Sequence, residues 1–290
     1  MLRVTLSLCA SMALLGCSDD ATPRAPPLLC NDLDGGCNRT GGGGGGGGGG
    51  FDAGVTLRDA GSGGLDAGAD GRVTVSGRVV VYQDIVGPAL GGASTPGAGW
   101  TLRSSRDEAL SGLSSDTGGF SLSGIPSEVF AGTAGRFYGL LASPPVTREL
   151  GSFRYYPADG SLAIVPAVGF DALQTAVAGA NGVVDLDAAH VIVLVRDSFD
   201  TGGMPLAGVS VQARSQPVVT YYDSALQSGQ LQVGDPRTGN RGIAAVLNLS
   251  VPREGAGSAT LVLSGVGASV NLDVPLYRRT VTWVTWVPRS

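Results

Sequence analysis

From Val73 onward the chain consists of short β-branched segments separated by turn signals. Val73–Tyr82 and Val191–Val195 are rich in valine and isoleucine, and Phe120–Leu122 alternates apolar and polar residues, which favours strands. Glycine pairs and Pro-Gly steps between such segments mark turns. Several short strands with turns about every ten residues are typical of β-sandwiches. The sequence therefore predicts an all-β fold.

Two stretches of the chain follow the same order of turns and strands. The glycine step at Gly92 recurs at Gly208, and the apolar-proline ending at Pro126 recurs at Pro252, with different loop lengths. Two copies of one domain explain this most simply. We therefore expect two tandem β-sandwiches, the first at 73–166, the second at 189–290, with residues 167–188 connecting them.

The connector is expected to contain a short helix over 168–178. The helical spacing of its apolar residues, an acid in the first turn and a glycine after the last residue indicate it: Phe170, Leu173, Val177, Asp171 and Gly179. We expect this helix to pack where the two sandwiches meet.

Both predicted sandwiches resemble the carboxypeptidase regulatory-like domain, which has a transthyretin-like or immunoglobulin-like β-sandwich fold. The resemblance depends on Gly77–Val80, Gly91–Ala93 and Asp116–Pro126 in the first unit, and on Pro205–Val211 and Thr238–Pro252 in the second. In that family the sandwich is an accessory or display module without catalytic residues. The resemblance therefore implies a structural or binding role.

The first residues of the chain resemble a bacterial lipoprotein signal. An uncharged apolar run follows Arg3, and Leu14, Leu15 and Gly16 directly precede Cys17. The run is too short to span a bilayer and has the layout of a cleaved signal. The resemblance implies a signal peptide at 1–16 and acyl chains, palmitate among them, on Cys17. An ordinary secretory signal with a chance cysteine is the alternative.

Residues 17–72 are expected to form a disordered tether. Gly41–Gly50 is an unbroken glycine run, and such a segment cannot bury enough apolar surface to offset its ordering entropy. An exported protein meets oxidising conditions, so Cys30 and Cys37 are expected to form a local disulfide rather than a metal site. The repeated aspartates of the tether lack the ligand pattern of a calcium loop.

Composition argues against several kinds of chemistry. The net charge of −5 disfavours nucleic acid as a partner. All 19 basic residues are arginine, so no lysine is present for a Schiff base or a phosphate loop. His190 is the only histidine, and we interpret it as structural because it directly precedes an apolar strand. We therefore predict no catalytic residue, no metal and no cofactor.

Aromatic residues are the remaining candidates for ligand contacts. The candidates are Trp283, Trp286, Tyr221 and Tyr222. The tryptophans lie in a strand expected at 279–287, on opposite faces of it. For these two we favour the alternative of core packing for one and edge coverage for the other. The tyrosines, like those in Arg154–Tyr156, are expected in loops.

These features predict a non-enzymatic, lipid-anchored cell-envelope protein that displays two β-sandwiches for structural or protein-binding purposes. Its expected partners are the membrane, through the lipid, and an envelope protein or a polysaccharide. Ser18 after the lipidated cysteine favours the outer membrane, by resemblance to proteobacterial sorting. Two alternatives stay open: a carbohydrate-binding surface adhesin module, and an accessory subunit of an envelope hydrolase.

Overall fold

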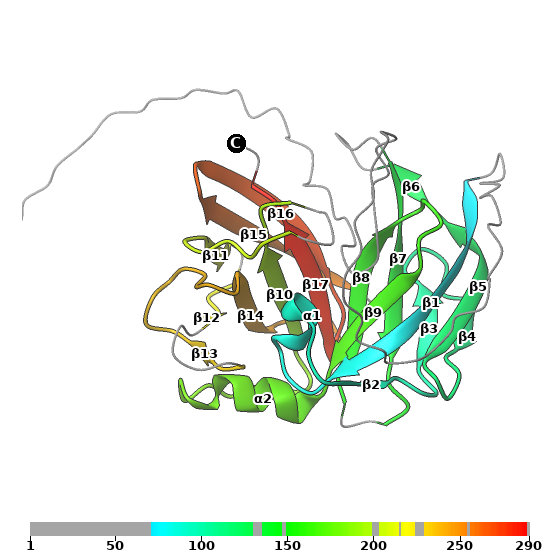
Figure 1. The fold of residues 1–290 in the computed structure, drawn as a ribbon, viewed down its shortest axis with the longest axis horizontal. Coiled ribbons are helices and arrows are strands. Elements are labelled where there is room, and N and C mark those ends of the chain that lie inside the picture. The colour runs from blue at the N-terminus through cyan, green and yellow to red at the C-terminus, as the bar shows by residue number, and fades with distance from the viewer. Residues whose placement is uncertain are drawn as a thin grey trace, which may run out of the picture.

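The computed structural model describes residues 71–129, 135–146, 149–198, 203–214, 216–223, 229–253 and 256–288. These residues form an all-β sandwich fold with two short helices, so the predicted fold class is confirmed. The predictions for the signal peptide, Cys17, Cys30, Cys37 and nearly all of the tether lie outside this range. Among the described residues the strands form three sheets (Figure 1).

The first sheet is built around β1 (Arg72–Tyr82). β1 pairs antiparallel with β5 (Gly119–Pro126) and β2 (Ser94–Pro96), and parallel with β9 (Ala163–Val168). Val73, Val75 and Val79 are buried, while the residues between them are exposed or half-buried. β1 therefore turns one face to a hydrophobic core, while its other face is exposed as far as Arg78 and ends at Tyr82, which is buried in a different core.

A ten-stranded sheet runs through the middle of the molecule. In spatial order it contains β13 (Leu231–Gln232), β12 (Thr220–Asp223), β14 (Ile243–Leu249), β10 (Ala189–Val195), β17 (Thr280–Trp286), β8 (Gly151–Pro157), β7 (Arg136–Ser143), β3 (Thr101–Ser104) and β4 (Ser111–Leu113), with β6 (Glu128–Val129) also paired to β7. The parallel pairing of β17 with β8 connects the two halves of this sheet. This sheet thus contains strands from both predicted sandwiches. The domain boundaries at 73–166 and 189–290 stay a prediction.

A third sheet, β11 (Ser210–Ala213), β15 (Gly257–Gly265) and β16 (Ala268–Leu276), completes the sandwich layers. Its buried residues share a core with β10, β14 and β17. The buried face of the first sheet shares another core with β3, β7 and β8. The ten-stranded sheet is therefore covered by different sheets at its two ends.

A further core lies on the other face of β10, β14 and β17, beneath α1 (Gly87–Leu90) and α2 (Phe170–Ala178) (Figure 1). α2 confirms the predicted helix, with Leu173 and Val177 fully buried. It begins at Phe170 because Gly169 is extended, with φ −68° and ψ 156°. This core joins Ile85 of the first predicted unit, Leu173 of the connector and Trp283 of the second.

Candidate functional site

The two tryptophans lie in β17, as predicted, and face opposite sides of the sheet. Trp283 is 1% exposed and packs in the core beneath the helices, whereas Trp286 is 2% exposed in the core beneath β15 and β16. Core packing is therefore confirmed for one tryptophan, and edge coverage for the other is wrong. Neither indole presents a face to a ligand in this structure.

Tyr221 and Tyr222 lie in β12 rather than in a loop, so that part of the prediction is wrong. Both are buried, in different cores. The Tyr222 hydroxyl accepts a hydrogen bond from the Val211 amide and donates one to the Val211 carbonyl, both at 2.9 Å. Burial raises the pKa of Tyr222. The Tyr222 hydroxyl thus connects β12 to β11, and neither tyrosine forms part of an exposed aromatic surface.

Arg154–Tyr156 also lies in a strand, β8, and not in the predicted loop. The Tyr156 hydroxyl donates to the carbonyl of Ile164 in β9 at 2.9 Å. Arg154 is buried and donates to Thr285 Oγ1 in β17 at 3.2 Å. Burial raises the pKa of Tyr156. These polar groups connect β8 to its neighbours, so their role is internal.

His190 lies in β10 and is fully buried. Its Nδ1 accepts a hydrogen bond from the Asn248 amide at 3.3 Å, and its Nε2 has no partner among the described residues. Burial lowers the pKa of His190 to about 4, although the backbone and charge of Asp185 act in the opposite direction. In the structure this imidazole is packed in the core, out of reach of a substrate.

Acid is expected to weaken the fold through His190. The unfolded state takes up a proton near pH 6.5, but the folded state does so only near pH 4, so stability present above pH 6.5 is lost between these values. The loss is about 3 kcal/mol. Urea unfolding at pH 7, 5.5 and 4 should show a shallower decline for His190→Gln than for the native chain. Parallel declines would contradict this assignment.

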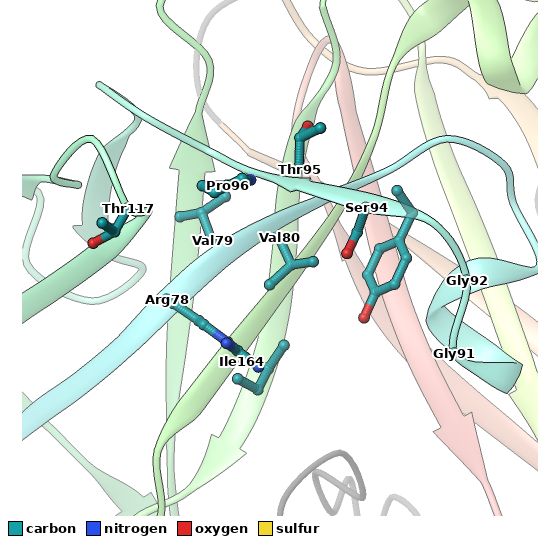
Figure 2. Close-up of a pocket in the computed structure, with 11 residues that line it drawn as sticks. Arg78, Val79, Val80, Gly91, Gly92, Ser94, Thr95, Pro96, Thr117 and Ile164 are labelled. Atoms are coloured by element: carbon teal, nitrogen blue, oxygen red, sulfur yellow. The ribbon is translucent and has the colours of Figure 1, made fainter. Parts of the chain in front are cut away.

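A partly open pocket of about 250 Å³ lies on the outer side of the first sheet (Figure 2). It is lined by side chains of β1, β2 and β9, by the backbone of the loop after α1 and by Thr117 in the turn before β5. The lining residues are Arg78, Val79, Val80, Tyr82, Gly91, Gly92, Ser94, Thr95, Pro96, Thr117 and Ile164. None of these is a carboxylate, although the whole chain is acidic. We name this feature the Arg78 pocket.

Strand alternation places Arg78 at this surface. Val79 points into the core, so its neighbours Arg78 and Val80 point outward from β1. Figure 2 shows the Arg78 side chain lying along the sheet with its guanidinium beside Ile164 of β9. The Arg78 side chain is exposed and makes no hydrogen bond or ion pair within the part of the chain that the structure describes. Its five N–H donors are therefore available to an external acceptor.

The opposite wall is β2, which is exposed along its length. Register pairs Ser94 with Tyr82 and Pro96 with Val80. In Figure 2 the Ser94 hydroxyl points toward the β1 side chains that line the pocket, whereas Thr95 turns away from Arg78. Ser94 thus adds one hydroxyl, a donor and acceptor, to the cation of Arg78.

The loop at the end of the pocket is held by local hydrogen bonds. Asp84 Oδ1 accepts from the amides of Val86 at 2.9 Å and Gly87 at 2.7 Å, which fixes the entry into α1. A Cβ on Gly92 would lie 2.8 Å from the Gly87 Cα, so glycine is required for this close approach. The loop therefore presents backbone, without side chains, at Gly91 and Gly92.

A second hollow of about 380 Å³ lies between the β1–α1 loop and α2. It is lined by Gln83, Asp84, Asp171, Ala172, Thr175, Gly229 and Gln230. No group of three or more histidine, cysteine, aspartate or glutamate residues that could hold a metal occurs among the described residues. Within the same ranges, no helix is long and apolar enough to cross a membrane.

Comparisons with known proteins give no family assignment. No protein-family model matches the chain, and no curated protein matches it. Among solved structures, an endo-fucoidan hydrolase from glycoside hydrolase family 107 is 14% identical over 73% of this chain and 28% of that chain, with a TM-score of 0.16. The chain thus matches about a quarter of that hydrolase. A likeness of this size carries no argument about fold or function.

Proposed function

We propose that this protein is a non-catalytic, lipid-anchored component of the cell envelope that presents a β-sandwich body to a partner. The observation that carries the proposal is the apolar run ending in Leu14, Leu15 and Gly16 directly before Cys17. Acyl chains on Cys17 would fix the chain to a membrane, and more than one chain suffices for stable anchoring. A glycine-rich tether of some 55 residues would have a mean reach of about 40 Å.

The architecture supports a display role. Three cores and a continuous ten-stranded sheet connect the described residues, so the strands on either side of the connector share hydrogen bonds and packing. A body built in this way can present a surface in fixed geometry. The resemblance of both sequence units to the carboxypeptidase regulatory-like domain favours the same role, because that domain is an accessory module.

The non-catalytic part of the proposal draws support from His190. As the sole histidine it is the only candidate for a histidine base, and it is packed within the core. The Arg78 pocket, by contrast, offers a cation, a hydroxyl and an apolar wall at the surface, which suits binding.

Lipidation is tested by metabolic labelling of producing cells with an alkyne analogue of palmitate. We expect label on the native chain and on Cys9→Ala, but none on Cys17→Ala, because only Cys17 would become the acylated N-terminus. Cys9→Ala is the matched control, since it removes a thiol from the same apolar run. Detergent-phase partitioning should follow the label. Equal labelling of all three chains, or of none, would overturn the proposal.

A further inference from the structure

We infer that the Arg78 pocket binds a carboxylated sugar, a uronate unit of an acidic polysaccharide. This inference deepens the proposed function and rests on it, because it names what the displayed body would bind. It combines three observations about one place: an unpaired cation, an apolar floor beside it and a hydroxyl opposite. Each of them fits a different part of a uronate ring.

The guanidinium of Arg78 favours a ligand with a negative charge. A guanidinium presents a planar fork of donors that matches a carboxylate in a bidentate pair. Arg78 has no internal partner among the described residues, and the pocket lining holds no carboxylate that would compete. A single arginine suits a single negative charge.

The apolar part of the pocket lining favours a ligand that has a ring with an apolar face. The half-buried Val80 and the exposed Pro96 supply the accessible aliphatic surface of the pocket, whereas Ile164 lies beside the guanidinium and is almost fully buried. Such a surface accepts the C–H face of a sugar ring, which free phosphate or sulfate does not have. Apolar surface beside the ion pair also excludes water from it, which strengthens the charge-assisted hydrogen bonds.

The wall and the size of the pocket complete the fit. The Ser94 hydroxyl can donate to, and accept from, a sugar hydroxyl. Drug-sized ligands occupy roughly 300–1,000 Å³. A pocket of about 250 Å³ lies below that range and suits one sugar unit. Because the pocket is partly open, a chain could continue beyond the bound unit.

The test is a calorimetric titration of the full, lipidated chain in uncharged detergent micelles with trigalacturonate. We expect saturable binding that weakens as ionic strength rises, because the pair is near the surface. Arg78→Gln should weaken binding by at least about tenfold, the usual scale for a charge-assisted pair. Arg237→Gln is the matched control, since Arg237 is also exposed and lies outside the pocket. Ser94→Ala should weaken binding by roughly threefold.

Three further probes separate the components of the inference. The native chain should bind the methyl ester of trigalacturonate as weakly as the Arg78→Gln variant binds the acid. Equal affinity of the native chain for acid and ester would overturn the inference. Acetate and inorganic phosphate should not displace trigalacturonate at matched concentration. Displacement by either would overturn the inference, because it would mean that the pocket binds anions in general rather than a sugar. No saturation by trigalacturonate, in a chain that incorporates palmitate at Cys17, would overturn this inference and leave the proposed function standing.

Discussion

Replacement of Trp283 by alanine is expected to lower the free energy of unfolding by about 3–5 kcal/mol, the usual range for a large aromatic residue removed from a core. Trp283 is 1% exposed and packs beneath both helices. Its core includes Ile85 and Leu173, which come from different parts of the sequence. A cavity there cannot be closed by one strand moving, because residues on several elements line it.

The measurement is urea unfolding followed by circular dichroism, with Met204→Ala as the control. Met204 is 67% exposed, so its truncation should change stability by no more than about 0.5 kcal/mol. Trp283→Phe should cost only about 1–2 kcal/mol, because it keeps most of the volume and removes an indole N–H that has no partner among the described residues. A loss below 1 kcal/mol in Trp283→Ala would contradict this account of the core.

The position of Trp283 also bears on how the two predicted units behave. If they were independent, the variant would unfold in two steps, with only the second unit destabilised. The shared core and the β17–β8 pairing instead favour a single transition that shifts as a whole. Unfolding curves of the native chain and of Trp283→Ala distinguish these two descriptions.

Local sequence patterns predicted the secondary structure where one strand face or one helix face is apolar. The apolar stretch Val191–Val195 lies within β10, and the valine-rich Val73–Tyr82 differs from β1 by one residue. The helix was predicted because Leu173 and Val177 lie one turn apart on its buried face. In each case the pattern comes from burial within a few residues, which the sequence shows directly.

The patterns failed where distant partners stabilise a polar segment. Arg154–Tyr156 looks like a loop because its residues are polar-aromatic, but the Tyr156 hydroxyl is satisfied by Ile164 in β9 and Arg154 by Thr285 in β17. Thr285 lies 131 residues away in sequence. The pairing of β17 with β8 is equally remote from any local signal. Only the assembled sheet shows why these polar groups can be buried.

The candidate site was partly accessible to sequence reasoning. Alternation along β1 places Arg78 outward, opposite to the buried Val79, and the strand itself was predicted. The pocket, however, depends on β2 pairing at one end of β1 and on β9 running parallel to it, which brings Ile164 beside the guanidinium. Neither pairing has a local sequence signature, so Arg78 alone gave no reason to expect a pocket.

Asp223→Ala is expected to be the second strongly destabilising change, with a loss of about 3–5 kcal/mol. Asp223 ends β12 and is 2% exposed. Its Oδ1 accepts from the amides of Gly239 at 2.8 Å and Ile243 at 3.0 Å, and its Oδ2 accepts from the Arg241 amide at 2.8 Å. Alanine would leave these three backbone donors without their acceptor, and each unsatisfied buried donor costs about 1–3 kcal/mol.

Asp223→Asn separates hydrogen bonding from packing. An asparagine retains one acceptor oxygen, so it can keep two of the amides but turns an N–H₂ group toward the third, and about 2 kcal/mol should be lost. Asp235→Ala is the control, because Asp235 is an exposed aspartate in the adjoining loop and should change stability by less than about 0.5 kcal/mol. Chemical unfolding of the four chains should therefore rank them native, Asp235→Ala, Asp223→Asn and Asp223→Ala. Equal stability of the two Asp223 variants would mean that the negative charge, which both variants lack, is what this residue contributes, rather than the hydrogen bonds to the loop amides.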